Sequence, residues 1–486
     1  MSSSFDDPRG LRKRRTPVYR LFLGLIGMCC TVFVVGVLMK GGSLHELPEP
    51  KTTLKNKKNY NNKNYVDPTL PTPFKYTSTL PPSSYPSTFY NYNNHPIIYT
   101  TPLPLAPPNV HPSDEYKYYP QLKTLSEIYT AWPQESLLRQ GDPVTPHVEY
   151  LRVFDFENED ERAEALKYRQ RELPFKMTNI PEIQKAIKKW SNPNYLLEQL
   201  QPSKKLRSSK NVNFSIDKTT KSGFFTWYDS RRYQSYVTSG LPNASKYKKP
   251  HNQVPSMSAL DFFKHAIIKG DWEGEIDTYD DHYYLQLGVN GVNQKKKKGV
   301  KTFIHDDLRN FIEPPENFFV FDFKQNKGVQ CRLGERGVTA AAHYDNGRNM
   351  IALLSGSKRY TLLPPNQCNL LSVIKLKEHP SRRHVLLNFK DIFEEEEGME
   401  DARKARGVDT IVKEGEVLYV PSRWFHYITS LQFSVQCNSR SGTNLLDNED
   451  AWDNEEYKVH GGGEDYGKSS SILYGGAKVV NECVDW

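Results

Sequence analysis

The chain has 486 residues, of which 65 are lysine or arginine, 57 are aspartate or glutamate and 37% are hydrophobic. This length allows one large domain or two medium ones with a sizeable core, but the hydrophobic content is low for a wholly globular chain and predicts a long polar, unstructured part. The net charge of +8 does not indicate a nucleic-acid-binding protein, because the basic residues are dispersed among many acidic ones.

The first predicted element is a transmembrane helix over residues 21–39. This run is uncharged and apolar, and about 20 such residues span a bilayer core. A cleaved signal peptide is the alternative, but the run is long for one and Lys40-Gly41-Gly42 is a poor cleavage site. Six basic residues precede the run: Arg9, Arg12, Lys13, Arg14, Arg15 and Arg20. They predict a cytosolic tail over residues 1–20 and a single-pass type II membrane protein whose remainder lies in the lumen of the ER or Golgi.

Residues 40–120 are predicted to form a disordered stalk, because they are rich in Pro, Thr, Ser, Asn and Tyr. Such a segment cannot bury enough apolar surface to offset the entropy lost on ordering. It could carry O-linked glycans, or its many tyrosines could make it an interaction segment. Glycosylation sequons at Asn213 and Asn243 agree with a lumenal location, although about two are expected by chance in a chain of this length.

A folded domain is predicted over residues 121–445, followed by an acidic and then glycine-rich tail over residues 446–486. Alternating apolar residues predict strands, and a period of about 3.6 residues predicts helices. The strands expected are 149–156, 279–287, 318–323, 337–345, 350–354, 358–363, 384–389 and 433–438, and the helices are 160–171, 257–267 and 391–406. The fold class expected is mainly β with flanking helices.

The residues that indicate chemistry begin in the strand 337–345. Side chains alternate between the faces of a strand, so His343 and Asp345 point the same way. The three small alanines before them suit a tight barrel interior. A second histidine, His426, ends the segment 415–426. Two histidines and one carboxylate on a β scaffold form the facial triad that binds non-heme Fe(II) and leaves positions open for a cosubstrate and O2.

Lys358 adds a second signal. The sequence predicts a strand over 350–354, a Ser-Gly-Ser turn and a strand over 358–363, so the hairpin return brings Lys358 alongside the strand of His343. A buried lysine suits the distal carboxylate of a bound diacid. A His-x-Asp tripeptide alone is a weak signal, and these companions make it much more specific.

These segments resemble the JmjC and cupin-like 2-oxoglutarate oxygenases, most of all the asparaginyl-hydroxylase branch. The family pattern is H-x-D-x-x-x-N, then G-x-K-x-x-x-L-x-P-P, then G-D-x-L-Y-x-P-x-x-W-x-H, and Glu416 replaces its second Asp. The matching positions are His343, Asp345, Asn349, Gly356, Lys358, Leu362, Pro364, Pro365, Gly415, Leu418, Tyr419, Pro421, Trp424 and His426. The resemblance runs from about residue 150 to about 442 and implies a double-stranded β-helix, the jelly-roll or cupin barrel. Residues 173–177 resemble the first strand of the family's domain, and residues 183–190 resemble a helix that follows it.

The resemblance also implies the cofactors, Fe(II) and 2-oxoglutarate. His343, Asp345 and His426 are expected to bind the iron and to be the catalytic residues. Lys358 is expected to hold the C5 carboxylate of 2-oxoglutarate. The activity implied is that of a dioxygenase, and we expect it to hydroxylate a side chain of a protein or peptide in the lumen. A membrane anchor with a stalk disfavours histone demethylation.

Three further residues are expected at the cosubstrate pocket. Asn349 and Asn438 match asparagines that line this pocket in the family. Thr339 stands for the hydroxyl residue shortly before the first histidine, although it comes one position early. The remaining histidines that could compete as ligands match no family position and are expected to be structural or solvent-facing: His305, His379 and His384.

Two other functions remain open. A catalytically inactive cupin-like binding or scaffold module would keep the barrel and lack bound metal. A Golgi glycosyltransferase would share the type II layout, but the Asp-x-Asp that many of these enzymes carry does not occur in the chain. The cysteines do not decide between them. Cys331, Cys368, Cys437 and Cys483 would face an oxidising lumen and allow three disulfide pairings, among which the sequence does not choose.

Overall fold

The computed structural model describes residues 119–134, 147–200, 214–220, 223–267, 281–289, 302–312, 318–320 and 326–442. The predicted cytosolic tail, transmembrane helix, nearly all of the stalk and the C-terminal tail therefore lie outside the described residues. Among the helices in these ranges, none is both long and apolar enough to cross a bilayer.

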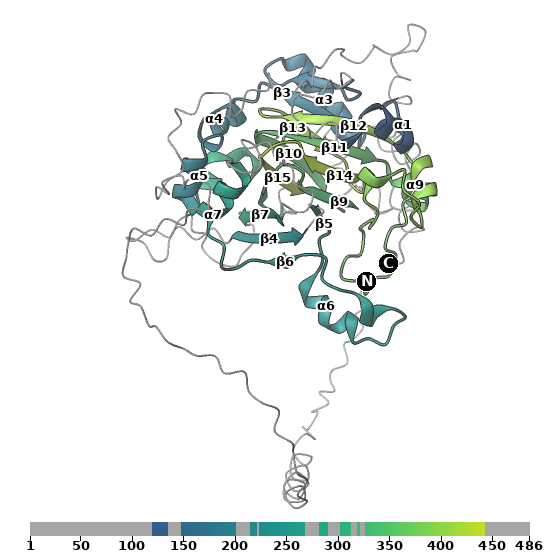
Figure 1. The fold of residues 1–486 in the computed structure, drawn as a ribbon. Helices are drawn as coiled ribbons and strands as arrows, with labels where there is room; N and C mark the ends of the chain where they lie inside the picture. The colour runs from purple at the N-terminus through teal and green to yellow at the C-terminus, as the bar shows by residue number, and fades with distance from the viewer. Residues whose placement is uncertain are drawn as a thin grey trace, which may run out of the picture. The chain divides into compact units, whose positions relative to one another are not determined.

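The strands in the described ranges form two sheets (Figure 1). The larger has the order β2-β3-β13-β10-β15-β8-β7-β4-β6, and the smaller has the order β1-β12-β11-β14-β9-β5. The strands are β1 (Lys123–Thr124), β2 (Val153–Asp155), β3 (Phe175–Thr178), β4 (Phe214–Thr220), β5 (Phe224–Phe225), β6 (Asn252–Gln253), β7 (Asp281–Val289), β8 (Val329–Gly334), β9 (Thr339–Tyr344), β10 (Arg348–Ser355), β11 (Ser357–Leu363), β12 (Arg406–Lys413), β13 (Val417–Val420), β14 (Phe425–Ser430) and β15 (Ser434–Ser441). Buried side chains of β10 and β15 share one hydrophobic cluster with those of β11 and β14. The two sheets therefore pack face to face, as a jelly-roll barrel requires.

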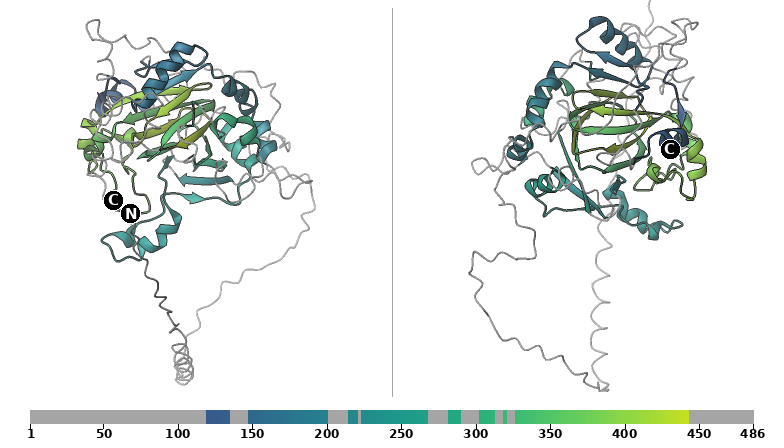
Figure 2. Two further views of the ribbon diagram at one scale, coloured as in Figure 1. Left: turned by 180° about the vertical axis from the view of Figure 1, so that it is seen from behind. Right: turned by 45° about the horizontal axis from the view of Figure 1, so that its top comes forward.

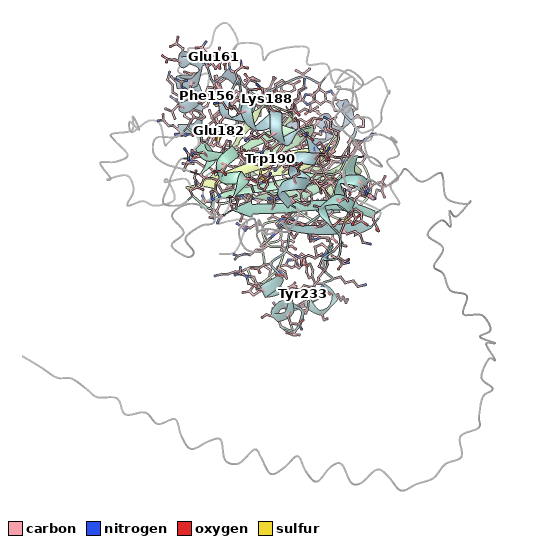
Figure 3. The ribbon with its side chains drawn as sticks, turned by 90° about the vertical axis from the view of Figure 1, so that its left-hand side faces the viewer. Phe156, Glu161, Glu182, Lys188, Trp190 and Tyr233 are labelled. Carbon is pink, nitrogen blue, oxygen red and sulfur yellow. A yellow bond between two sulfur atoms is a disulfide. The ribbon has the colours of Figure 1, made fainter. Side chains whose placement is uncertain are left out.

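Helices flank the two sheets, except α6, which lies in a small lobe beyond β6 (Figures 1 and 2). The helices are α1 (Leu125–Ala131), α3 (Glu159–Gln170), α4 (Pro181–Trp190), α5 (Pro193–Leu200), α6 (Ser230–Val237), α7 (Ala259–Phe263), α8 (Phe303–Asp307) and α9 (Met399–Lys404). Helix α4 shows why they pack there. Its residues Ile183, Ala186 and Trp190 follow helical spacing and are buried, while Lys185 and Lys188 are exposed (Figure 3). One apolar stripe is enough to hold such a helix against a sheet.

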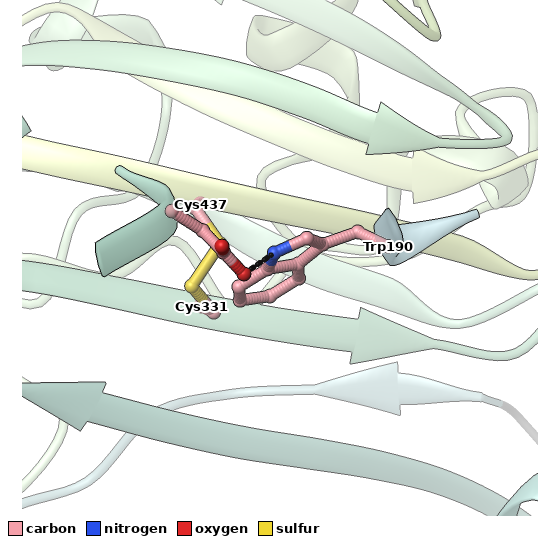
Figure 4. The surroundings of a disulfide bond; sticks show 4 residues. Trp190, Cys331 and Cys437 are labelled. Carbon is pink, nitrogen blue, oxygen red and sulfur yellow. Dashed lines mark hydrogen bonds between the residues drawn. A yellow bond between two sulfur atoms is a disulfide. The ribbon is translucent and has the colours of Figure 1, made fainter. Parts of the chain in front are cut away.

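A disulfide crosses the larger sheet. Cys331 of β8 and Cys437 of β15 are directly opposed in the antiparallel register, and their Cα atoms are 4.0 Å apart (Figure 4). The indole of Trp190 lies beside this bond, and its Nε1–H donates to Asp307 at 2.8 Å. Cys368 is disulfide-bonded as well. Of the pairings that the sequence left open, strand register selects the one that joins Cys331 to Cys437.

A small lobe around α6 carries one of the histidines that could compete for metal. The rings of Tyr236 and Tyr247 lie 4.8 Å and 4.6 Å from the ring of His379. Tyr233, a residue of α6 that is labelled in Figure 3, lies in the same lobe. Nδ1 of His379 accepts a hydrogen bond from the backbone N–H of Ser381 at 3.0 Å, and burial lowers the pKa of the ring to about 4. This histidine therefore packs as a neutral side chain in the lobe.

Three predicted elements were wrong in extent or type. Residues 318–320 form a turn, because their aromatic side chains pack on Phe156 and Phe311 instead of pairing as a strand. The expected strand 384–389 pairs only through isolated bridges. The expected helix 391–406 is limited to α9, since Gly398 adopts a left-handed φ of 88° immediately before it.

Candidate metal centre

The candidate centre lies where β9 meets β14. These strands pair antiparallel with His343 directly opposite His426, and Asp345 follows the last residue of β9. The two Nε2 atoms are 3.2 Å apart, and His426 Nε2 is 3.8 Å from a carboxylate oxygen of Asp345. One ligand atom from each residue lies within 4.8 Å of the other two. The alternation of side chains along the strands thus brings together the three residues that the sequence singled out.

Both imidazoles are oriented by the backbone. His343 Nδ1 lies 2.8 Å from the carbonyl oxygen of Ala341, and His426 Nδ1 lies 3.1 Å from that of Trp424. A carbonyl oxygen only accepts, so each Nδ1 carries the proton and each Nε2 presents a lone pair. Two lone pairs that face each other at 3.2 Å repel unless a cation lies between them. This donor set, with a carboxylate beside it, suits a divalent metal ion.

The charge states favour the same conclusion. Burial is the main cause that lowers the pKa of His343 and of His426, and a second effect on His343 is the proximity of His426. Burial would raise the pKa of Asp345, but Arg440 and the two imidazoles hold it well below its usual value. Near neutral pH the centre therefore contains two neutral imidazoles and one carboxylate, which are the forms that bind metal.

Asn349 supports the carboxylate from behind. Its Nδ2 donates to Asp345 at 2.8 Å, and its Oδ1 accepts from Asn438 at 2.9 Å and from Arg440 at 3.2 Å. Arg440 Nη2 also contacts Asp345 at 2.8 Å. The structure thus places Asn349 and Asn438 beside the centre, where hydrogen bonds orient the carboxylate.

His384 lies closer to the centre than the sequence predicted. Its ring stacks on that of His343 with 4.8 Å between centroids and 8° between planes. It is only 3% exposed, and burial lowers its pKa to about 4. The half-exposed indole of Trp227 stacks on its other side with 6.2 Å between centroids. Its backbone bridge opposite His343, a tertiary contact, could not be found from sequence spacing.

Lys358 points into the barrel. It is 1% exposed on β11, and its Nζ lies 5.6 Å from the ring centroid of Tyr284. Burial, and after it the charge of Arg332, lower the pKa of Lys358 to about 7. In the described part of the chain, no carboxylate forms an ion pair with this ammonium group. Lys358 is buried as the sequence predicted, but the predicted hairpin was wrong: β10 and β11 lie in different sheets, and β14 separates β11 from the His343 strand β9.

Thr339 does not line the pocket. It pairs with Thr429, three residues after His426, and residues three apart on a strand face opposite sides. A bulge in β9 between Ala340 and His343 produces this reversal. Thr339 Oγ1 lies 3.2 Å from Thr429 Oγ1 and accepts from Gln134 at 3.3 Å, outside the barrel. The expectation that Thr339 binds the cosubstrate was therefore wrong.

Sequence reasoning also missed polar residues that share the interior. Arg440 contacts Asp345, and Tyr360 donates to Gln436 at 2.6 Å. Their alternation along β11 and β15 is visible in the sequence. Which face points inward depends on strand pairing, which the sequence does not show.

Comparison with protein families identifies one matching family model, described as a cupin-like domain, over residues 161–440. This match covers more than half of the chain and includes the whole candidate centre. It begins near α3 and ends at Arg440, the residue that contacts Asp345.

Several curated proteins are similar to part of the chain. The tRNA wybutosine-synthesizing protein 5 of Danio rerio is 29% identical over 164 residues, which are 33% of this chain and 45% of that protein. The lysine-specific demethylase JMJ30 of Arabidopsis thaliana is 28% identical over 27% of this chain and 29% of its own length. The HSPB1-associated protein 1 of Rattus norvegicus is 26% identical over 28% of this chain and 29% of its own length. The chain thus spans less than half the length of each of these relatives.

Proposed function

We propose, from the premise that this chain belongs to the cupin-like JmjC domain family, that it is an Fe(II)- and 2-oxoglutarate-dependent oxygenase. The observation that carries the proposal is the convergence of His343, Asp345 and His426, whose ligand atoms lie within 4.8 Å of one another. Their tautomers and charge states suit a divalent cation, and three protein ligands would leave coordination positions for other ligands.

The roles of the residues follow from their positions. His343, Asp345 and His426 would hold Fe(II), and Lys358 would bind the distal carboxylate of 2-oxoglutarate. Asn349 keeps Asp345 oriented, and Asn438 keeps Asn349 oriented. Bound iron with 2-oxoglutarate would supply O2 activation coupled to decarboxylation to succinate and CO2. The buried interior excludes bulk water from this reaction, and the protein orients the reactants.

The proposed substrate is a protein or peptide, of which one side chain is hydroxylated. We further propose that residues 21–39 anchor the protein in the membrane and that the domain lies in the ER or Golgi lumen. The charge asymmetry around that run and the sequon at Asn243 support this location. The disulfide between Cys331 and Cys437 supports it too, because cytosolic proteins seldom keep such bonds.

The test is succinate release by the full-length protein with Fe(II), 2-oxoglutarate, ascorbate and a peptide library. We expect succinate with some peptides, together with a mass increase of one oxygen atom on the peptide. His343→Ala and Asp345→Ala should abolish both, and Mn(II) titration should show that these variants no longer bind metal. If no peptide raises succinate release above that of His343→Ala, the oxygenase proposal fails and a binding module becomes the better reading.

A further inference from the structure

The barrel interior holds a second cation beside Lys358. Arg332 of β8 has Gln286 of β7 and Gln436 of β15 as register partners, so the three share one face of the larger sheet. Tyr284, two residues from Gln286, shares this face as well. The hydroxyl of Tyr360, two residues beyond Lys358 on the opposite sheet, donates to Gln436 at 2.6 Å. This contact brings the face that carries Arg332 to the strand that carries Lys358.

Neither cation has an acidic partner in the ranges that the structure describes. Arg332 is partly buried, and its inward Nη1 has no acceptor among the described residues. Lys358 is 1% exposed and lies over the ring of Tyr284. The two side chains can therefore bind a negatively charged group that enters the barrel.

The charge of Arg332 reaches Lys358. After the larger effect of burial, this charge lowers the pKa of Lys358. A negatively charged group bound at Lys358 would therefore also be attracted to the guanidinium group of Arg332.

We propose that Arg332 is a second cosubstrate-binding residue, which together with Lys358 holds the distal carboxylate of a 2-oxoglutarate-like dicarboxylate. The choice of ligand rests on the proposed function. A planar guanidinium group can bind a carboxylate through two parallel hydrogen bonds, and the ammonium group adds a third. The pair of cations should also reject a ligand whose distal group is a neutral amide.

The test is isothermal titration calorimetry of the full-length protein with 2-oxoglutarate at neutral pH, without metal and again with Mn(II). Arg332→Gln is expected to weaken binding at least about tenfold in both conditions, because a charge-assisted hydrogen bond is lost. Arg332→Lys should recover much of the affinity, since it keeps the charge. Arg231→Gln makes the same change on a side chain that is 89% exposed and should leave the affinity unchanged.

A second ligand separates recognition from folding. The 5-amide of 2-oxoglutarate lacks the distal negative charge, so the wild-type protein should prefer the diacid. Arg332→Gln should reduce that preference at least about tenfold. If Arg332 only supported the fold, its substitution would lower the affinity for both ligands equally. Thermal unfolding of the unliganded variants would measure such a role directly.

Three outcomes would overturn the assignment: equal affinity of Arg332→Gln and wild type for the diacid, an equal loss for the diacid and its amide, or no binding of the diacid to the wild type in either condition. Succinate formation is measured separately. Binding as expected without turnover would leave Arg332 assigned and refute the oxygenase. Turnover with an unchanged KM for 2-oxoglutarate in Arg332→Gln would support the oxygenase and refute the assignment of Arg332.

Discussion

At the scale of single residues, the interior is organised by charge. Near the metal centre, the carboxylate of Asp345 is kept ionised by Arg440 and the imidazoles are kept neutral by burial. At the other end, Lys358 has a pKa of about 7 and is therefore only partly charged near neutral pH. The three residues of the candidate centre are thus in the forms that bind metal, whereas near neutral pH Lys358 would become fully charged only when an anion binds.

This difference predicts that 2-oxoglutarate affinity depends on pH. The diacid would favour the ammonium form of Lys358 and raise its pKa in the complex. Below about pH 7 the free lysine is already protonated, so the affinity should be constant. Above that pH the protein must take up a proton on binding, and the affinity should fall about tenfold per pH unit until the pKa of the complex is reached.

Calorimetry from about pH 6 to pH 9 in buffers of different ionisation enthalpy measures both the affinity and the proton uptake. Lys358→Met should bind weakly and show neither the slope nor the uptake. Affinity that is flat or rises across this range in the wild type would contradict the role of Lys358. In Arg332→Gln, the pH at which the affinity begins to fall should move upward, because Arg332 lowers the pKa of the free lysine.

Thr339 offers a test of the bulge in β9. Because its hydroxyl bonds Gln134 and Thr429 outside the barrel, Thr339→Val should leave 2-oxoglutarate affinity unchanged. It should lower the free energy of unfolding by about 1–3 kcal/mol, since buried partners lose a hydrogen bond. Urea denaturation and calorimetry measure the two quantities. A large loss of affinity with unchanged stability would mean that Thr339 faces the pocket after all.

At the scale of elements, a buried ionic network joins the segment before the barrel to the outer face of the smaller sheet. Arg359 of β11 donates from Nε to Asp409 of β12 at 3.0 Å, and His147 contacts the same carboxylate at 3.2 Å. The guanidinium group also lies 4.5 Å from the ring centroid of Tyr129 in α1. Because these groups are almost fully buried, each depends on the others for compensation.

Removal of either Arg359 or Asp409 alone should therefore lower the free energy of unfolding more than removal of both charges together. Asp409→Leu leaves the charge of Arg359 buried without its carboxylate and should lower the free energy of unfolding by about 3–5 kcal/mol. The double variant Arg359→Met with Asp409→Leu removes both charges and should be clearly more stable than the single variant. Denaturant unfolding of wild type, both single variants and the double variant measures the coupling. Additive losses would show that the pair does not act as a unit.

At the scale of the whole molecule, the open question is the compartment. The predicted anchor lies outside the described residues, but the domain itself contains an N-glycosylation sequon, whose modification would test the location. Asn243 of the sequon Asn-Ala-Ser is exposed and has a left-handed φ of 59° at the start of a short 3-10 helix. A turn at the surface can present such a side chain to the glycosylation machinery.

We therefore expect Asn243 to carry an N-linked glycan in the full-length protein from eukaryotic cells. Treatment with an N-glycosidase should increase its electrophoretic mobility, and Asn243→Gln should remove one step of that shift. Ala244→Gly keeps the sequon, and that control should leave the shift intact. A chain without any N-glycan, recovered from a cell fraction that contains glycosylated lumenal proteins, would argue against the lumenal orientation.

The sequence by itself determined the ligand set of the candidate centre. The alternation of a strand puts His343 and Asp345 on one face. This is a local regularity over a few residues, and for this reason it is visible without coordinates. Local patterns also predicted most of the strands and helix α3, and the family resemblance indicated α4, with errors at the ends, where pairing rather than pattern sets the limits. The expected hairpin between 350–354 and 358–363 was wrong, because β10 and β11 pair with strands of different sheets.

Tertiary structure alone decided the relations between distant strands. The bulge in β9 turned Thr339 out of the pocket, a bridge placed His384 against His343, and strand register joined Cys331 to Cys437. Register also placed Arg332 on the inner face beside Gln436. A shift of one residue exchanges the two faces of a strand, and nothing in the local sequence records which shift the partner strand imposes.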